Sequence, residues 1–394
     1  MNVTVVPGKL AGTIPAIPSK SIAHRALICS AFASAETNIL LDQTNADIEA
    51  TADCLRALGA TITRSSHGYH ISPAKHIPSR AVLHCRESGS TLRFLLPVVG
   101  ALGVDAEFRT EGRLGHRPLS PLWEEMIRMG CSLTRGTDGS IYCSGELHSG
   151  IFQISGNISS QFISGLLFAG ALMNGETKIE ILGNPESMPY IEMTRDVLSV
   201  FGITTENFFI SSAHTLISPG TFAVEGDWSN AAFFLTAAAL GSSVTVTGLD
   251  NNSRQGDRSI LPILESLKNN ATISAVDIPD LVPILSIAAA AKDGAVFTNI
   301  QRLRLKESDR VSTVVQMIRA LGGQAYADDT TLTVKGTGLV GGTVDSSNDH
   351  RIAMAAAIAA TVCKNPVTIL TAEAVNKSYP GFWKDFQTLG GQYE

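Results

Sequence analysis

Segments rich in small apolar residues recur along the chain, and each is followed by a short turn and a run of β-branched residues. A helix that is apolar on nearly every side belongs in a protein core, and β-branched residues favour strands. The pattern therefore predicts six buried helices, each leading into a strand. These helix–turn–strand segments span residues 26–39, 94–103, 162–181, 231–247, 282–298 and 353–369.

A second repeat lies between these segments, where amphipathic helical patterns end in a bulky apolar residue followed by glycine. Glycine suits this place because the residue just past a helix often adopts a left-handed conformation. A sixth helix is predicted to end near residues 267–269 without the glycine. The pairs are Leu58-Gly59, Met129-Gly130, Phe201-Gly202, Leu321-Gly322 and Leu389-Gly390. The two repeats together predict an α/β fold of six units of roughly 50–72 residues, each with a buried and an outer helix.

The division into domains follows from the length and from the repeat. A chain of 394 residues exceeds what one hydrophobic core usually supports. The first unit opens near Gly12, and a Ser/Pro/Gly-rich stretch at 211–220 precedes the fourth unit. We expect one domain at residues 14–223 and a second made of residues 1–13 and 224–394. The two crossovers side by side predict a hinge between the domains.

Charge and cysteine content narrow the class of protein. The 30 Lys+Arg against 36 Asp+Glu give a net charge of −6, which argues against a general nucleic-acid or membrane-surface binder. Six cysteines without a CxxC motif indicate reduced thiols rather than a zinc site or a disulfide framework. No signal sequence is evident, and no apolar run reaches about 18 residues. We therefore expect a cytoplasmic protein.

The residues at the starts of the buried helices indicate anion binding. Capping accounts for Ser229 and for a serine at other starts. It does not account for Lys20, Arg25 and Arg351, because a cation in the first helical turn opposes the helix dipole. A positive helix end together with a cation suits an anionic ligand.

Two loops and one carboxylate add to this picture. The run 302–310 and the segment 113–118 are dense in charge and each leads into a predicted helix. Such a run is either a solvated turn or part of a binding site. Asp280 follows Ile278-Pro279 at the fifth helix start. It is either a helix cap or a general base for a hydroxyl group.

Nine motifs, in order and in register, give these features a family context. The chain resembles the 5-enolpyruvylshikimate-3-phosphate (EPSP) synthase family over essentially its whole length. The motifs lie at residues 18–26, 87–95, 113–118, 158–162, 187–191, 278–283, 304–310, 348–355 and 376–383. The resemblance implies a two-domain inverse α/β barrel with three βαβαββ units per domain and a hinge between the domains.

The resemblance also implies a reaction. The enolpyruvyl group of phosphoenolpyruvate is transferred to the 5-hydroxyl of shikimate 3-phosphate by addition and elimination, and phosphate is released. This step belongs to the shikimate pathway of chorismate and aromatic amino acid biosynthesis, and it uses no metal and no organic cofactor. Asp280 matches the base, and Lys20 and Glu307 are alternative proton donors to the methylene carbon. Members of the family are usually monomers.

The residues that match the two substrate sites are implied in the same way. Shikimate 3-phosphate would contact Lys20, Ser21, Arg25, Ser159, Ser160, Gln161, Ser187, Tyr190, Asp280 and Lys306. Phosphoenolpyruvate would contact Lys20, Gly89, Arg117, Gln161, Arg310, Arg351 and Lys377.

The chain departs from the usual pattern of the family at a few positions. It has Glu87-Ser88-Gly89-Ser90 where many members have Asn-Ala-Gly-Thr, and it has Arg302 where an asparagine helps to bind phosphate. Because Gly89 is retained, glyphosate is expected to find room in the phosphoenolpyruvate site. The potency of glyphosate and the role of Arg302 stay open.

Two other functions compete with this interpretation. The related transferase acting on UDP-N-acetylglucosamine typically has Lys-Asn where this chain has Lys20-Ser21, and a reactive cysteine in the loop that here spans residues 111–117 without one. A non-catalytic sensor of small anions would have no use for Asp280 and Glu307, because carboxylates weaken anion binding. Both alternatives are therefore disfavoured.

Overall fold

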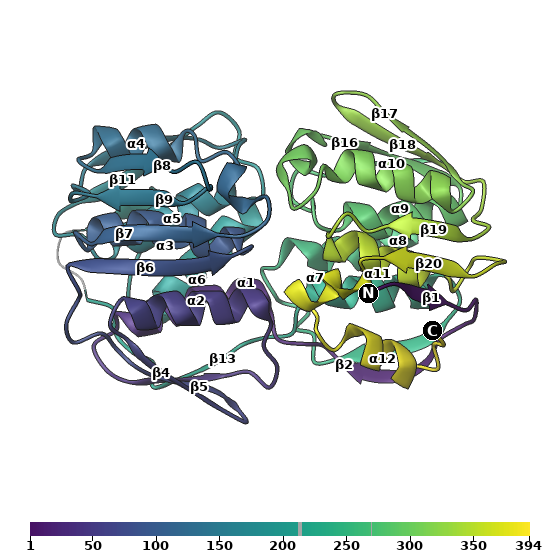
Figure 1. The fold of residues 1–394 in the computed structure, drawn as a ribbon, viewed down its shortest axis with the longest axis horizontal. Coiled ribbons are helices and arrows are strands. Elements are labelled where there is room, and N and C mark those ends of the chain that lie inside the picture. Colours follow the sequence, from purple (N-terminus) through teal and green to yellow (C-terminus); the bar gives the residue numbers. More distant parts are fainter. Residues whose placement is uncertain (212–214, 269) are drawn as a thin grey trace. The chain divides into compact units, whose positions relative to one another are not determined.

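The computed structural model describes residues 1–211, 215–268 and 270–394, which divide into two units (Figure 1). Unit 1 contains Met1–Ile17 and Gly226–Glu394, and unit 2 contains Pro18–Glu225. The domain limits predicted after residues 13 and 223 lie a few residues before these limits. Each unit has its own cluster of buried hydrophobic residues.

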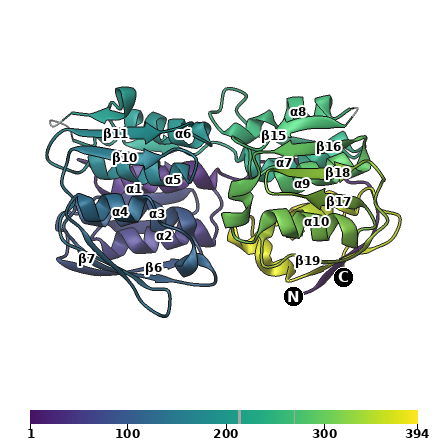
Figure 2. The same ribbon diagram turned by 90° about the horizontal axis from the view of Figure 1, so that it is seen from above.

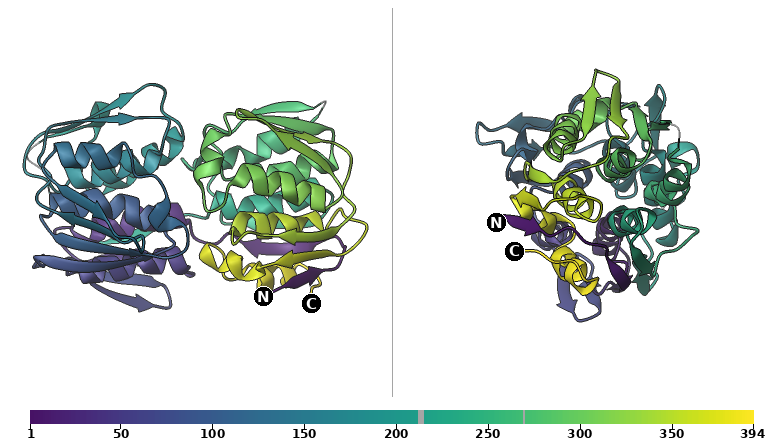
Figure 3. Two further views of the ribbon diagram at one scale, coloured as in Figure 1. Left: turned by 45° about the horizontal axis from the view of Figure 1, so that its top comes forward. Right: turned by 90° about the vertical axis from the view of Figure 1, so that its right-hand side faces the viewer.

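The predicted buried helices are confirmed. Every residue of α1 from Ile22 to Ala31 is buried, and α9 is buried in the same way. In unit 2 these helices are α1 (Lys20–Ala31), α3 (Gly89–Ala101) and α5 (Ser160–Gly170). In unit 1 they are α7 (Trp228–Ala239), α9 (Val282–Ala291) and α11 (His350–Ala359). Strands lie around them in each unit (Figures 2 and 3).

The outer helices alternate with the buried ones along the chain. They are α2 (Ala46–Ala57), α4 (Leu122–Arg128), α6 (Met188–Val200), α8 (Ile260–Ser266), α10 (Arg310–Ala320) and α12 (Phe382–Thr388). The glycine that follows five of them has a positive φ, from 82° at Gly202 and Gly322 to 111° at Gly130. The predicted left-handed glycine is therefore confirmed. Helix α8 ends at Ser266, and Asn269, where the pattern placed the end of this helix, lies outside the described residues.

The sheets of unit 2 show the repeat as strand order. The orders are β13-β3-β5-β4, β6-β7-β9-β8 and β10-β11-β12. The strands are β3 (Thr37–Leu40), β4 (Thr61–Ser65), β5 (Gly68–Ser72), β6 (Arg80–Arg86), β7 (Asp105–Thr110), β8 (Ser132–Arg135), β9 (Ile141–Ser144), β10 (Ile151–Ser155), β11 (Thr177–Leu182), β12 (Phe209–Ile210) and β13 (Thr221–Ala223). Strands β6 and β7 are parallel because α3 crosses between them, whereas β9 and β8 pair antiparallel.

Unit 1 has sheets of the orders β15-β16-β18-β17, β1-β20-β19 and β14-β2. Its strands are β1 (Val3–Val5), β2 (Ala11–Pro15), β14 (Ser243–Thr247), β15 (Ala271–Ser274), β16 (Gly294–Thr298), β17 (Gln324–Ala327), β18 (Thr331–Lys335), β19 (Gly342–Asp345) and β20 (Val367–Leu370). The first residues of the chain belong to this unit because β1 pairs with β20 and β2 pairs with β14. The order β15-β16-β18-β17 repeats the pattern of β6-β7-β9-β8, with one parallel pair followed by two antiparallel pairs.

Short 3₁₀ segments connect several of these elements. They are η1 (Leu114–His116), η2 (Glu206–Phe208), η3 (Gly256–Ser259), η4 (Gln301–Leu305) and η5 (Ala372–Lys377). None of the helices in the described residues is long and apolar enough to cross a membrane. The mixed α/β fold predicted from the sequence is thus present, and each unit contains the starts of three buried helices.

Candidate active site

The starts of the buried helices in unit 2 are capped by serines in two cases. The Ser88 hydroxyl accepts a hydrogen bond from Thr91 N at 3.3 Å, and Ser159 accepts one from Gln161 N at 3.3 Å. In α7 of unit 1 the cap is Asp227, which accepts from Asn230 N at 2.7 Å. The assignment of Ser229 as a cap is therefore wrong. Ser229 lies inside α7, where its hydroxyl donates to Asp257.

Lys20 and Arg25 both lie on α1, and both are already engaged. The Lys20 ammonium is 2.8 Å from Asp47 Oδ2. The Arg25 guanidinium donates to Thr194 Oγ1 at 2.8 Å, to Ser21 O at 2.6 Å and to Tyr190 O at 2.7 Å. Burial lowers the pKa of Arg25 to about 10, so it stays charged at pH 7. Arg25 thus joins α1 to α6 and fixes two residues, Ser21 and Tyr190, that sequence motifs assign to one ligand.

Three further predicted residues lie together at the start of α3. A Cβ on Gly89 would lie 3.0 Å from Arg117 Nη1 and 2.7 Å from Arg93 Nη1. Gln161 accepts from Arg93 Nη1 at 3.1 Å and donates to Ser90 Oγ at 3.0 Å. Two guanidinium groups therefore converge on the bare backbone of Gly89, with the Gln161 amide hydrogen-bonded to one of them.

Arg93 was missed as a site residue. It is only 4% exposed, and it contacts the predicted residue Gln161 directly. Its position four residues after Gly89 could have revealed it, because the same argument about a cation near a helix start selected Arg25. The other predicted residues of this unit also lie at helix starts. Ser160 is the first residue of α5, and the buried Ser187 is the N-cap of α6, with a φ of 56°.

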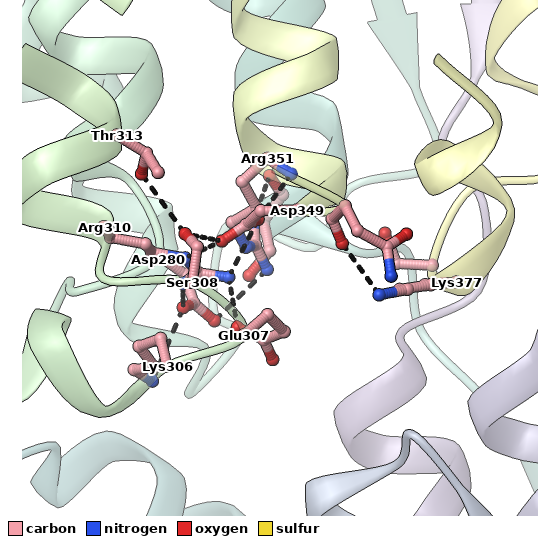
Figure 4. Close-up of polar contacts among 12 residues, drawn as sticks. Asp280, Lys306, Glu307, Ser308, Arg310, Thr313, Asp349, Arg351 and Lys377 are labelled. Carbon is pink, nitrogen blue, oxygen red and sulfur yellow. Dashed lines mark hydrogen bonds and ion pairs between the residues drawn. The ribbon is translucent and has the colours of Figure 1, made fainter. Parts of the chain in front are cut away.

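Arg310 is the centre of a charged cluster in unit 1 (Figure 4). It is the first residue of α10, and only 1% of its side chain is exposed. Its Nη1 donates to Asp280 at 2.6 Å, its Nη2 to Glu307 at 2.6 Å, and its Nε to Asp349 at 2.8 Å. One guanidinium therefore holds three carboxylates from three separate segments of the chain.

Asp280 lies among three cations. Besides Arg310, the Arg351 Nη2 atom is 3.2 Å from Asp280 Oδ2, and the Lys306 ammonium is 3.6 Å from Asp280 Oδ1. Burial raises the pKa of Asp280, but Arg351, Lys306 and Arg310 outweigh burial and hold this pKa well below its ordinary value. Burial lowers the pKa of Lys306 to about 8. Both groups are therefore charged at pH 7.

The structure decides two alternatives that the sequence left open. Helix α9 has Leu281 as its N-cap and no side-chain cap, so Asp280 is not a capping residue. The run 302–310 is not simply a solvated turn, because Arg310 is buried and Lys306 and Glu307 join the cluster. Arg304, in contrast, donates to Asp328 O at the surface.

Asp349 is the main residue of this cluster that sequence reasoning missed. It is fully buried and caps α11 by accepting from Arg351 N at 3.0 Å. Ser308 donates to its second oxygen at 3.0 Å, as does Arg310 at 2.8 Å. Lys377, which the motifs assigned to the same ligand as Arg351, donates to Asn348 O at 2.7 Å, just before this cap (Figure 4). An aspartate at a helix start reads as an ordinary cap, so no sequence signal distinguished Asp349.

The described residues contain no group of three or more His, Cys, Asp or Glu side chains arranged to hold a metal ion. What the cluster in unit 1 offers is three carboxylates, Asp280, Glu307 and Asp349, against the cations Lys306, Arg310 and Arg351. An incoming anion would compete with the carboxylates for these cations, which is a way to change the charge state of Asp280 on binding.

Comparison with known proteins identifies the family. The family model for EPSP synthase (3-phosphoshikimate 1-carboxyvinyltransferase) matches residues 5–386. The chain belongs to the EPSP synthase family. A 3-phosphoshikimate 1-carboxyvinyltransferase of Clostridium kluyveri is 37% identical over 100% of this chain and 98% of its own length. One from Clostridium perfringens is 38% identical over 99% of this chain and 98% of its own.

Solved structures agree on the fold. An EPSP synthase from Acinetobacter baumannii has a TM-score of 0.80 at 24% identity and covers 100% of this chain and 99% of its own. The enolpyruvyl transferase NikO from Streptomyces tendae has a TM-score of 0.79 at 17% identity, covering 100% and 98%. The resemblance drawn from the nine motifs is therefore confirmed, and the EPSP synthase family supplies the context for the residues above.

Proposed function

We propose that this chain is a 3-phosphoshikimate 1-carboxyvinyltransferase, which transfers the enolpyruvyl group of phosphoenolpyruvate to the 5-hydroxyl of shikimate 3-phosphate and releases phosphate. One observation carries the proposal. In a chain that matches the EPSP synthase family over residues 5–386, a single carboxylate, Asp280, is held by Arg310, Arg351 and Lys306. Two arginines can bind a carboxylate or a phosphate bidentately, and Asp280 is then the group left to accept a proton.

Asp280 acts as the general base for the 5-hydroxyl. Held by its cations it is a weak base, because they keep its pKa well below the ordinary value. Substrate anions that bind Arg310, Arg351 and Lys306 draw these cations away from Asp280 and bring negative charge near it, and both effects raise its pKa. The base therefore gains strength when the substrates are bound.

The reaction also needs an acid that delivers a proton to the methylene carbon of phosphoenolpyruvate. Protonation of the methylene carbon of phosphoenolpyruvate makes C2 electrophilic, the deprotonated 5-hydroxyl adds to C2, and loss of a methyl proton with phosphate restores the double bond. Glu307 and Lys20 are the two candidate donors of the proton that adds to the methylene carbon. Glu307 is 2.6 Å from Arg310, and Lys20 is 2.8 Å from Asp47.

The binding roles are those that the family resemblance implies. Shikimate 3-phosphate is held through its phosphate by Ser159, Ser160, Ser187 and Lys306, on its carboxylate side by Ser21 and Arg25, and along its ring by Gln161 and Tyr190. Phosphoenolpyruvate is held by Lys20, Gly89, Arg117, Gln161, Arg310, Arg351 and Lys377. The convergence of Arg117 on Gly89 supports the second group.

The finer description of the fold belongs to the same proposal. We infer a two-domain inverse α/β barrel with three βαβαββ units per domain and a hinge. Bringing two substrates together in this way can contribute up to about 7–11 kcal/mol to lowering the barrier. Solution scattering should show a smaller radius of gyration with shikimate 3-phosphate than without it, and identical profiles would contradict closure.

The biological setting follows from the family. The proposed protein works in the shikimate pathway of aromatic amino acid biosynthesis, as a cytoplasmic monomer acting on small molecules. Six buried free cysteines support a reducing compartment. Glyphosate is the proposed inhibitor, because the unsubstituted Cα of Gly89 leaves room beside Arg117.

Phosphate release in a mixture of the two substrates tests the function directly. Wild-type protein should release phosphate with phosphoenolpyruvate and shikimate 3-phosphate, and Asp280→Asn should lose at least about 100-fold in kcat while still binding shikimate 3-phosphate. The matched control is Asp329→Asn, which changes an exposed aspartate between β17 and β18. Release only with UDP-N-acetylglucosamine would indicate the related transferase, and ligand binding without any release would indicate a sensor.

A further inference from the structure

Four buried polar side chains form a continuous line of hydrogen bonds inside unit 2. His24 Nδ1 is 2.7 Å from Thr51 Oγ1, Thr51 Oγ1 is 2.7 Å from Thr91 Oγ1, and Thr91 Oγ1 is 2.7 Å from Ser88 Oγ. All four side chains are fully buried. They come from α1, α2, α3 and the residue that caps α3, so the line crosses three helices.

The direction of donation along this line follows from counting protons. A hydroxyl has one proton to donate, and Thr91 donates to Ser88. Thr91 must then accept from Thr51, and Thr51 must accept from a protonated His24 Nδ1. Burial, with Lys20 and Arg25 nearby, lowers the pKa of His24 well below its ordinary value, so the ring is neutral with its one proton on Nδ1. The line therefore has one consistent arrangement.

Thr91 is the point where the line meets the predicted phosphoenolpyruvate contacts. The Ser88 hydroxyl, which Thr91 holds, caps α3 immediately before Gly89. Thr51 lies on α2 one turn after Asp47, whose carboxylate binds Lys20 at 2.8 Å. Two residues proposed to hold one ligand, Gly89 and Lys20, are thus joined through the hydrogen bond between Thr91 and Thr51.

We propose that Thr51 and Thr91 are positioning residues for phosphoenolpyruvate: their hydroxyls fix the Gly89 N–H relative to the Lys20 ammonium. This inference rests on the proposed function. The hydroxyls touch no reacting atom, and they act through Ser88 at the start of α3 and through α2, which carries Asp47. Buried hydrogen-bond networks specify one arrangement of the groups they join, and a misplacement of about 1 Å in a site can cost a large factor in rate.

A purely structural role predicts a different result. Buried hydroxyls that serve only stability should lower the melting temperature when removed but should leave the binding of both substrates unchanged. Positioning predicts a selective loss, because the line leads to Gly89 and Lys20, whereas Ser160 and Ser187, which are proposed to hold the shikimate phosphate, lie at the starts of α5 and α6.

The test compares KM values for the two substrates in matched threonine variants. Thr91→Val and Thr51→Val keep the shape of the side chain and remove the hydroxyl, whereas Thr91→Ser keeps the hydroxyl. Thr177→Val is the control, because Thr177 in β11 has a buried hydroxyl with no hydrogen-bond partner among the described residues. Melting temperatures are measured for the wild type and for the four variants.

The valine variants at Thr91 and Thr51 should raise KM for phosphoenolpyruvate about 3- to 10-fold relative to KM for shikimate 3-phosphate, which corresponds to one buried hydrogen bond. Thr91→Ser and Thr177→Val should stay within about twofold of wild type. Equal changes in both KM values, no change, or failure of both valine variants to fold would overturn the proposal. An inactive wild-type protein would instead refute the proposed function.

Discussion

Lys306 gives the proposed site a pH dependence that can be worked out from the structure. Burial, with smaller effects of Arg310 and Arg302, lowers its pKa to about 8 against the opposing effect of Asp280. Its ammonium is 3.6 Å from Asp280, and 22% of its side chain is exposed. Lys306 is proposed to bind the phosphate of shikimate 3-phosphate, and only the protonated amine attracts a phosphate dianion.

The magnitude follows from the fraction of protonated lysine. With a pKa of about 8, about nine in ten molecules carry the proton at pH 7, and about one in eleven carries it at pH 9. KM for shikimate 3-phosphate should therefore rise about 10-fold between pH 7 and pH 9. The phosphate group itself is already doubly ionised over most of this range, since its second pKa is about 6.

Initial rates of phosphate release, measured from pH 6.5 to pH 9.5 at saturating phosphoenolpyruvate, provide the assay. The control is Lys306→Arg, because a guanidinium keeps its charge throughout this range. The comparison concerns the shape of the pH profile and not the absolute KM at pH 7, and the profile of Lys306→Arg should be flat. A flat wild-type profile, or an equal rise in Lys306→Arg, would refute the reasoning.

The same shift has a consequence for stability. Between pH of about 8 and about 10.5 the unfolded chain keeps a proton on Lys306 that the folded protein has lost. The unfolding free energy should therefore rise with pH across this window, and the titration of Lys306 should give it no pH dependence below the window. Lys306→Arg should abolish that rise in urea unfolding curves.

Three further outcomes test other parts of the two units. Arg310→Leu removes the partner of three carboxylates and should lower the unfolding free energy by about 3–5 kcal/mol in urea, and a loss below about 1 kcal/mol would contradict the cluster. Gly89→Ala places a Cβ 2.7 Å from Arg93 and 3.0 Å from Arg117. It should raise KM for phosphoenolpyruvate about 10-fold and leave KM for shikimate 3-phosphate unchanged. An unchanged ratio of the two KM values would be evidence against this site. Burial and the nearby Asp280 raise the pKa of Asp257 to about 6, so the folded protein retains a proton there that the unfolded chain loses. The unfolding free energy should fall as pH rises from about 4 to about 6, and Asp257→Asn should flatten that fall, whereas parallel curves would argue against the shift.

The repeat was predictable because it rests on local chemistry. A helix that is apolar on all sides has one place to go, and a glycine after a helix marks its end, so α9 and Gly322 could be located by pattern alone. The cations at helix starts were predictable for a related reason. Lys20 and Arg351 oppose the dipole of their own helices, and such a conflict indicates a ligand.

Contacts between segments far apart in sequence were not predictable in this way. Asp349 looks like an ordinary cap, and only the fold brings Arg310 to it across 39 positions of sequence. Ser229 was wrongly predicted to be a cap, because a serine near a helix start resembles a cap whether it precedes the helix or lies inside it. The line from His24 to Ser88 needs three helices to be packed before it is continuous, although Ser88 and Thr91 already meet at the start of α3.

Because β1 pairs with β20, unit 1 can complete its fold only late in the synthesis of the chain. Unit 2 is a continuous segment, Pro18–Glu225, so all of its sequence has left the ribosome before most of unit 1 exists. Val3 can pair with Ile369 only after residue 369 has been synthesised. Residues 1–17 therefore lack their partner strands at the time when unit 2 can already fold. Unit 1 folds last, and shortening the chain at either end should damage unit 1 and spare unit 2.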